Sequence, residues 1–178
     1  MKTPIWFAVL VSGACGAAVE HKQLDLTSAS LGGYAFDVPA DWHRSDAKAA
    51  RATTATWTPD VEGNDAKESL VVIRTQLTPA LETAGMPYLE HLLADAQHEL
   101  PQFQPTHAVT TFSTTRNLSG ARVEVDFVPA GKKRTYHRVH ALLLDGNSLI
   151  HVLYTAARPD YRQDAFNAVV NSVHRGEG

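Results

Sequence analysis

Alternation of hydrophobic and polar residues runs through most of the chain and predicts a domain rich in antiparallel β-strands. Apolar residues recur at every second position in short runs bounded by Gly, Pro, Asn or Asp, which is typical of strands. The segments 45–52 and 59–67 lack this pattern, and we assign the first, alanine-rich one to a loop or a short helix. The expected strands are 23–27, 33–38, 53–58, 69–77, 107–115, 121–128, 134–144 and 148–156.

Two segments show a helical repeat instead. From Pro87 to about Leu100, apolar residues recur at intervals of three and four, and proline is favoured in the first turn of a helix. A second helix is expected over 160–173, with Phe166 and Val170 on its apolar side. The predicted order is therefore strands, a helix, a four-strand meander and a closing helix.

The last predicted hairpin is apolar on both faces. Leu142 and Leu153 lie on one face, whereas Val139 and Tyr154 lie on the other. A strand pair with two apolar faces has to be covered on both of them. We therefore predict an α+β fold in which an antiparallel β-sheet is the middle layer of an α/β/α sandwich.

The first twenty residues have the organisation of an export signal. Lys2 precedes an uncharged apolar run over 4–14, which as a helix would span roughly 16 Å, about half of the hydrocarbon thickness of a bilayer. Small residues before Val19 favour cleavage at that point. On this interpretation residues 1–18 are a signal peptide, and 19–178 form one domain that is periplasmic or held in the cell envelope.

Cys15 offers a second interpretation of the same segment. It is the only cysteine of the chain and directly follows the apolar run, where a bacterial lipoprotein carries its lipid-modified cysteine. Ser12, however, stands where leucine is usual in such signals. An ordinary signal peptide and a lipoprotein signal ending before Cys15 therefore remain alternatives, and the chain is exported in either case.

Composition limits the classes of function. The hydrophobic set makes up 44% of the chain and charged residues 20%, which excludes a disordered chain and a polytopic membrane protein. A net charge of −3 argues against nucleic acid as a partner, because such binding depends on cations that neutralise phosphates. Neither a Gly-x-Ser-x-Gly sequence nor a phosphate-binding glycine pattern is found. The sequence therefore contains no catalytic motif strong enough to name a reaction.

Nine histidines are the most unusual feature of the composition. If Asp145-Gly146 forms a two-residue loop, His140 lies directly opposite His151, with the Cβ atoms ~5 Å apart. Glu124 or Asp126 on a neighbouring strand could then complete a site for a divalent metal. The alternative is a pair of imidazoles bonded to each other or covered by helix side chains, because two histidines alone are an incomplete metal site.

The segment Tyr34-Ala35-Phe36-Asp37-Val38-Pro39-Ala40-Asp41-Trp42 resembles the aromatic-x-Phe-x-x-Pro-x-x-Trp opening of the PsbP-like fold family, which has DcrB-like members in the bacterial envelope. The order of predicted elements over about 30–175 is similar to that family as well. The resemblance implies a PsbP-like domain. It also implies no catalytic residues, because members of the family are mostly non-enzymatic accessory, chaperone or binding proteins.

Together these observations predict a non-enzymatic exported protein that binds another envelope protein, as an accessory, chaperone-like or immunity-type module. One alternative is a carrier of a small ligand or lipid, with a cavity between sheet and helices near Leu92, Leu142 and Leu153. Another is a metal-binding protein that uses His140 and His151. No cofactor is expected beyond that divalent metal, and membrane contact is expected only through a lipid on Cys15.

Overall fold

The computed structural model describes residues 24–49, 51–59, 68–98, 104–105, 108–129 and 131–176. The first half contains five strands and a helix: β1 (Leu26–Leu31), β2 (Tyr34–Pro39), β3 (Trp42–Lys48), β4 (Ala52–Pro59), β5 (Glu68–Gln76) and α1 (Pro79–His98). The second half contains β6 (Gln104–Pro105), β7 (Thr110–Ser113), β8 (Ser119–Phe127), β9 (Tyr136–Asp145), β10 (Ser148–Ala157), a 3₁₀ turn (Arg158–Asp160), α2 (Gln163–Ser172) and β11 (His174–Arg175). The predicted signal peptide and Cys15 lie outside the described residues.

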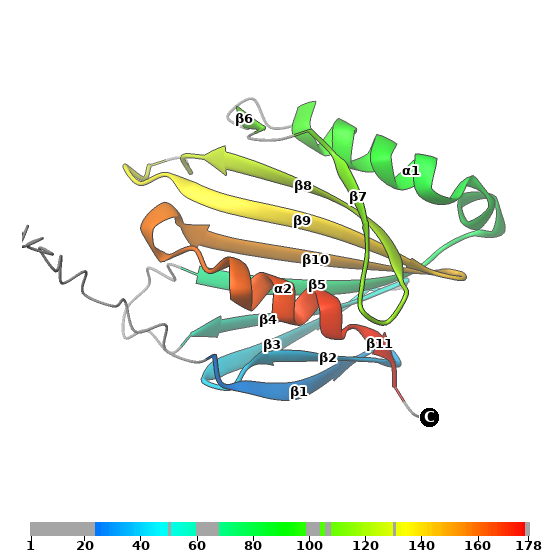
Figure 1. Ribbon diagram of the computed structural model, residues 1–178, viewed down its shortest axis with the longest axis horizontal. Helices are drawn as coiled ribbons and strands as arrows, with labels where there is room; N and C mark the ends of the chain where they lie inside the picture. The colour runs from blue at the N-terminus through cyan, green and yellow to red at the C-terminus, as the bar shows by residue number, and fades with distance from the viewer. Residues whose placement is uncertain are drawn as a thin grey trace, which may run out of the picture.

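The strands form two sheets (Figure 1). The large sheet has the order β3-β4-β5-β10-β9-β8-β6, with β7 also paired to β8, and the small sheet has the order β1-β2-β11. Every strand pairing in the described part of the chain is antiparallel. The predicted α+β class is therefore confirmed, and so is the meander that ends in β9 and β10.

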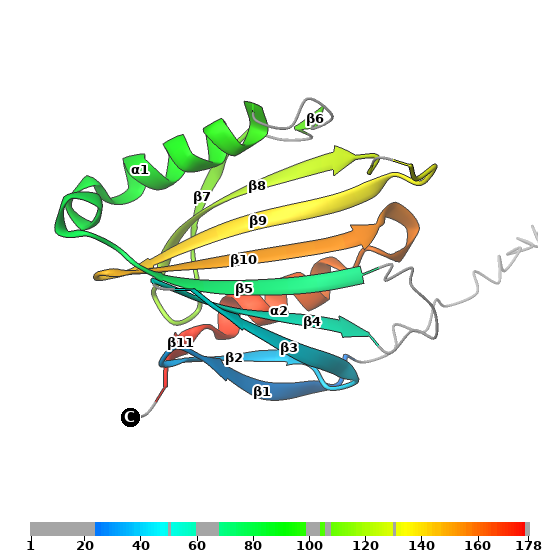
Figure 2. The ribbon, with the colours of Figure 1, turned by 180° about the vertical axis from the view of Figure 1, so that it is seen from behind.

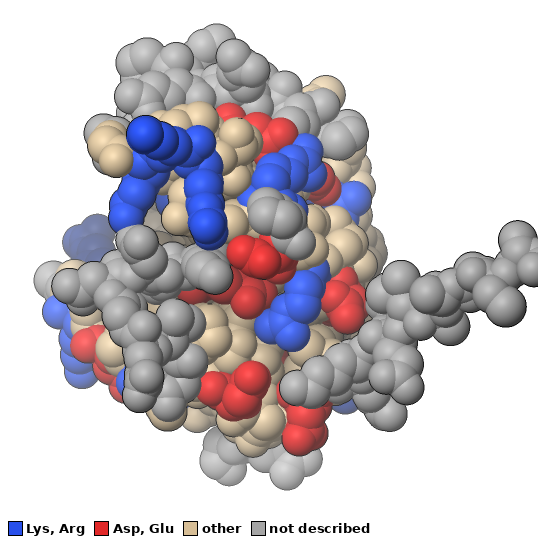
Figure 3. Space-filling view, turned by 90° about the vertical axis from the view of Figure 1, so that its left-hand side faces the viewer, with Lys and Arg blue, Asp and Glu red and all other residues tan. Residues whose placement is uncertain are grey.

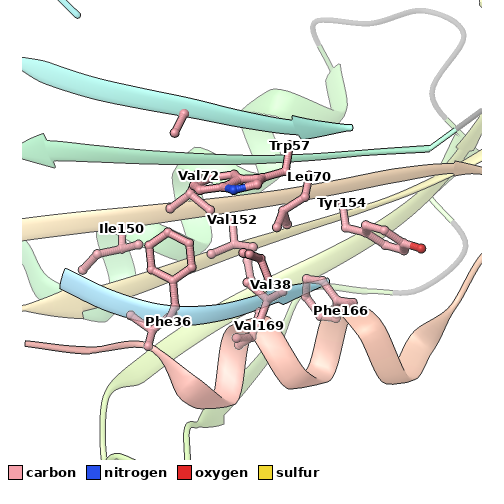
Figure 4. Close-up of a cluster of buried hydrophobic side chains, with 14 of the residues drawn as sticks. Phe36, Val38, Trp57, Leu70, Val72, Ile150, Val152, Tyr154, Phe166 and Val169 are labelled. Carbon is pink, nitrogen blue, oxygen red and sulfur yellow. The ribbon is translucent and has the colours of Figure 1, made fainter. Parts of the chain in front are cut away.

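Both faces of the β9–β10 hairpin are covered, as its two-sided apolar pattern predicts. On one face, Phe36 and Val38 of β2 and Phe166 of α2 point toward strand residues such as Val152 (Figure 4). On the other face, Leu89 and Leu93 of α1 pack with a second cluster that includes Ala121, Val123 and Leu142. The view from behind shows α2 on the far side of β5 and β10 (Figure 2). The large sheet is thus the middle layer.

The aromatic residues of the Tyr34–Trp42 segment are core residues. Tyr34, Phe36 and Val38 alternate along β2 and are at most 5% exposed. The Phe36 ring meets Trp57 edge-on with 5.4 Å between centroids, and Trp42 stacks on Tyr154 at 6.3 Å. This segment therefore attaches the small sheet to the large one by burying aromatic surface.

Two parts of the fold differ from the prediction. The segment 45–52, predicted as loop or helix, contributes to the edge strand β3, in which only Trp42 is buried; its polar residues on both faces hide the period of two. The helix α1 begins at Pro79 rather than Pro87. A short helical segment precedes the predicted helix, and the two meet at a kink at Gly85, where φ of 56° is a conformation that glycine readily adopts.

Smaller differences concern the ends of elements. The strand predicted at 23–27 is β1 at Leu26–Leu31, and the closing helix starts at Gln163 after the 3₁₀ turn rather than at 160. In the part of the chain that the structure describes, neither helix combines the length and the apolar character needed to cross a bilayer.

Candidate functional site

The two histidines that the sequence places together lie on the same face of the sheet, but not directly opposite each other. His140 pairs with Leu153, and His151 with Leu142, because the hairpin loop is Gly146-Asn147 rather than Asp145-Gly146. Gly146 has φ of 56°, and the positive φ at the first loop residue suits a type II′ turn. The predicted register is therefore wrong by one loop position. The two rings remain diagonal neighbours with 5.4 Å between centroids.

The third predicted ligand does not join them. Glu124 pairs with Val139 and its neighbour Val123 pairs with His140, so the Glu124 side chain is on the opposite face of the sheet. Asp126 pairs with His137 and lies on that opposite face too. Among the described residues, no group of three His, Cys, Asp or Glu side chains could hold a metal ion. Metal binding by the pair therefore stays a prediction that lacks its third ligand.

Burial keeps the histidine pair uncharged. It lowers the pKa of His140 to about 3, with further contributions from His151 and Arg138, and it lowers the pKa of His151 to about 4, helped by Arg138. The Nε2 atom of His151 is buried with no hydrogen-bond partner. At neutral pH the pair therefore behaves as part of the packed sheet face.

This gives a testable pH dependence. The unfolded chain binds protons at these histidines below about pH 6.5 whereas the folded chain does not, so folding stability falls as the pH falls through this window. Between pH 7.5 and 5.5 we expect each histidine to cost about 1 kcal/mol of unfolding free energy. Urea unfolding should show a smaller loss for the His140→Leu/His151→Leu variant than for the wild type. An equal loss in the two proteins would contradict the assignment.

A third histidine, His137, lies in a cluster of charged groups on the other face of the sheet. It was not identified from the sequence. His137 of β9 is 2% exposed. Its Nδ1 is 2.7 Å from Asp126 Oδ1, and its Nε2 is 3.4 Å from Glu124 Oε2. Arg158 donates to the other Asp126 oxygen at 2.8 Å, and the Tyr161 ring meets the His137 ring edge-on. Both ring nitrogens thus face carboxylates.

A neighbouring network fixes the start of α2. The Tyr154 hydroxyl donates to Glu68 Oε1 and accepts a hydrogen bond from the backbone N–H of Arg162 at 3.3 Å. The Arg162 guanidinium lies 3.3 Å from the same Glu68 oxygen and 5.9 Å from the Trp42 ring centroid. Burial, then the Glu68 contact, raises the pKa of Tyr154, which keeps the phenol protonated. The residue before α2 is therefore tied to both β5 and β10.

Figure 3 views the end of the molecule that holds these two networks. Basic and acidic side chains are intermingled over this end. In both networks each charged group faces a partner of opposite charge or a hydrogen-bonding partner, which is the arrangement of groups that support a fold. The sequence did show that Glu124 and Asp126 alternate with valines and so share one polar face of β8. That His137 lies beside them could be seen only from the pairing of β8 with β9.

A groove lies between β7 and α2. It has a volume of about 340 Å³ and one arginine, Arg122 of β8, in its wall. The groove is lined by Thr110, Thr111, Phe112, Ser113, Arg122, Phe166, Asn167, Val170 and Asn171. Phe112 lies above Gly120, where an added Cβ would come within 2.8 Å of the Phe112 ring and of the Leu142 carbonyl oxygen. Glycine at that position thus lets β7 pack closely on the sheet.

The space predicted for a carried ligand is occupied by side chains. Leu142 is 3% exposed and belongs to the same cluster as Leu89 and Leu93 of α1, with Leu92 packed against it. Leu153 is on the same face, half-buried beside His140. The groove beside β7 is on the other face of the sheet and shares none of the three predicted lining residues.

Comparisons with known proteins bear on the fold. No family model matches the sequence, and no curated protein is similar to it. The structure is similar to the cyanobacterial PsbP (CyanoP) of Synechocystis sp. PCC 6803, with a TM-score of 0.58, 18% identity and coverage of 92% of this chain and 100% of that chain. It is also similar to LpqN, described as involved in cell envelope biogenesis of Mycobacterium tuberculosis, with a TM-score of 0.59, 15% identity and coverage of 84% and 89%.

A third similar structure comes from Bacteroides thetaiotaomicron, with a TM-score of 0.52, 9% identity and coverage of 82% of this chain and 46% of that one. At these identities the similarity concerns the fold and not the activity. The relation to DcrB-like proteins stays a prediction. The similarity to CyanoP over the whole of that chain confirms the predicted architecture, and this chain therefore has the PsbP-like fold.

Proposed function

We propose that the protein is exported to the cell envelope and acts there by binding another protein, without catalysis. The observation that carries the proposal is the chemistry of the groove between β7 and α2. Arg122 is the only ionisable residue among the described residues that line it. General acid–base catalysis needs a group that exchanges protons near the working pH, and a guanidinium stays charged. The groove is therefore suited to hold a ligand rather than to transform one.

The cluster around His137 supports the same conclusion. His137 is the kind of residue that serves as a general base, but it is 2% exposed and sits between Asp126 and Glu124. The similarity to LpqN, whose description refers to cell envelope biogenesis, and the export signal predicted from the sequence support a location in the envelope. An accessory, chaperone-like or immunity-type role is compatible with each of these observations.

Capture from the envelope tests this proposal. The tagged protein is expressed from its own leader in the native host, cross-linked and purified from the envelope fraction beside an unrelated exported domain. We expect one envelope protein enriched over that control. After separate purification, it should form a complex of defined stoichiometry in titration calorimetry. No enrichment over the control, or failure of the purified pair to associate, would contradict a binding function.

We also propose that the mature chain begins at Cys15 or at Val19. Intact-mass spectrometry of the protein recovered from the envelope distinguishes these starts, because acyl chains on Cys15 add a fixed mass and an unmodified Val19 does not. A mass that retains the first 14 residues would overturn both.

A further inference from the structure

The groove beside β7 follows the edge of that strand. Side chains alternate between the two faces of a strand, so a hollow lined by four consecutive residues, Thr110 to Ser113, runs along the backbone rather than over one face. These four residues pair with 119–122 of β8 along one edge. Along the other edge they have no strand partner among the described residues. Backbone N–H and C=O groups at such an edge can pair with another chain.

Helix α2 forms the opposite wall. Phe166, Asn167, Val170 and Asn171 line the groove and occupy one side of the helix, since they are spaced by one turn. At one end the Thr115 hydroxyl donates to the Asn171 carbonyl oxygen at 2.7 Å, which joins the β7–β8 turn to α2. This hydrogen bond thus bounds the groove at the Thr115 end.

The lining offers hydrogen-bond donors and carries a positive charge. The Arg122 side chain is 37% exposed, and its Nη2 lies 4.0 Å from Glu124 Oε1, at the outer limit of an ion pair. Gln163 Nε2 donates to Asn167 Oδ1 at 3.0 Å, which leaves the Asn167 amide nitrogen to donate. The described residues that line this groove include no carboxylate. An acidic group is therefore the complementary ligand.

We propose that an extended segment of the partner protein adds as a strand to the free edge of β7, with an acidic side chain on Arg122. The proposal rests on the binding function argued above. Four residues of strand would span about 13 Å at about 3.3 Å each, and the groove volume of about 340 Å³ lies at the lower end of the usual range for ligand sites. Main-chain bonds to β7 supply affinity, and Arg122 and Phe112 select the side chains.

Selection from a display library of random ten-residue peptides tests the proposal on the wild-type domain. Enriched peptides should combine β-branched or aromatic residues at alternate positions with one Asp or Glu. Fluorescence polarisation then compares three proteins: the wild type, Arg122→Gln, and Arg116→Gln as a control on the exposed β7–β8 turn. We expect Arg122→Gln to weaken binding roughly tenfold or more, and Arg116→Gln to leave it unchanged.

A second variant separates binding in the groove from general attraction of acidic peptides. Asn167→Trp places a large side chain from an exposed position over the groove and should abolish binding while the thermal unfolding midpoint stays that of the wild type. Enriched peptides that lack acidic residues, an equal loss in both arginine variants, or binding that tolerates Asn167→Trp would overturn the proposal. If the envelope partner is captured equally well by Arg122→Gln and by the wild type, the groove is refuted while the binding function stands.

Discussion

Replacing Phe166 by alanine is expected to lower the free energy of unfolding by about 3–5 kcal/mol. Phe166 is 1% exposed and is the largest of the α2 side chains buried in the core, with its ring centroid 6.4 Å from that of Tyr154. Alanine would leave a cavity between α2 and the sheet. Because small domains are stable by about 5–15 kcal/mol in total, the loss should be evident as a lower urea midpoint.

Asn167→Ala is the matched control for Phe166→Ala. Asn167 is the next residue of the same helix and is exposed, so the change should stay within about 0.5 kcal/mol. If the two variants unfold at the same urea concentration, α2 does not cover the sheet as described.

Replacing Asp126 by alanine should have the second large effect, about 2–3 kcal/mol, because the carboxylate that accepts two hydrogen bonds is lost. The change removes the oxygen atoms that contact His137 Nδ1 and Arg158, and it leaves a ring that is 2% exposed without the carboxylate at its Nδ1. The Asp126 side chain is 23% exposed, so water can partly replace the lost contacts. Chemical denaturation measures the loss of stability directly.

Two further variants show whether the lower stability of Asp126→Ala reflects the lost contact with His137. Asp126→Asn keeps an oxygen at the same place and should be intermediate. Asp160→Ala removes an exposed acidic group nearby and should change stability by less than about 0.5 kcal/mol. If Asp126→Ala is as mild as Asp160→Ala, the His137 cluster does not hold the sheet and the 3₁₀ turn together.

The faces of the central hairpin could be predicted from the sequence, but the position of its loop could not. Moving the loop by one residue shifts each cross-strand pair by two, so Leu142 and Tyr154 keep the faces that their alternation indicates. Asp145, the residue before the loop, makes tertiary contacts. Tyr34 donates to Asp145 Oδ2 at 3.0 Å, and Arg175 donates to the same carboxylate. These partners are 111 and 30 residues away in sequence, beyond the reach of turn preferences.

Less of the candidate site than of the fold could be predicted from the sequence. Glu68 and Arg162, which meet at the start of α2, are 94 residues apart. The groove depends on where β7 leaves the sheet and on how α2 crosses below it, and neither is encoded in a local pattern. The sequence reflects this packing at one position: residue 120 is glycine, and only glycine fits opposite the Phe112 ring.

The contact surface itself is open to direct measurement by amide hydrogen exchange of the mature protein, alone and with the partner recovered from the envelope. We expect slower exchange on binding at 110–113 of β7 and at 163–171 of α2, because the backbone of β7 becomes hydrogen-bonded to the added strand. Unchanged exchange in β7, with protection confined to α1 or to β3 and β4, would contradict it.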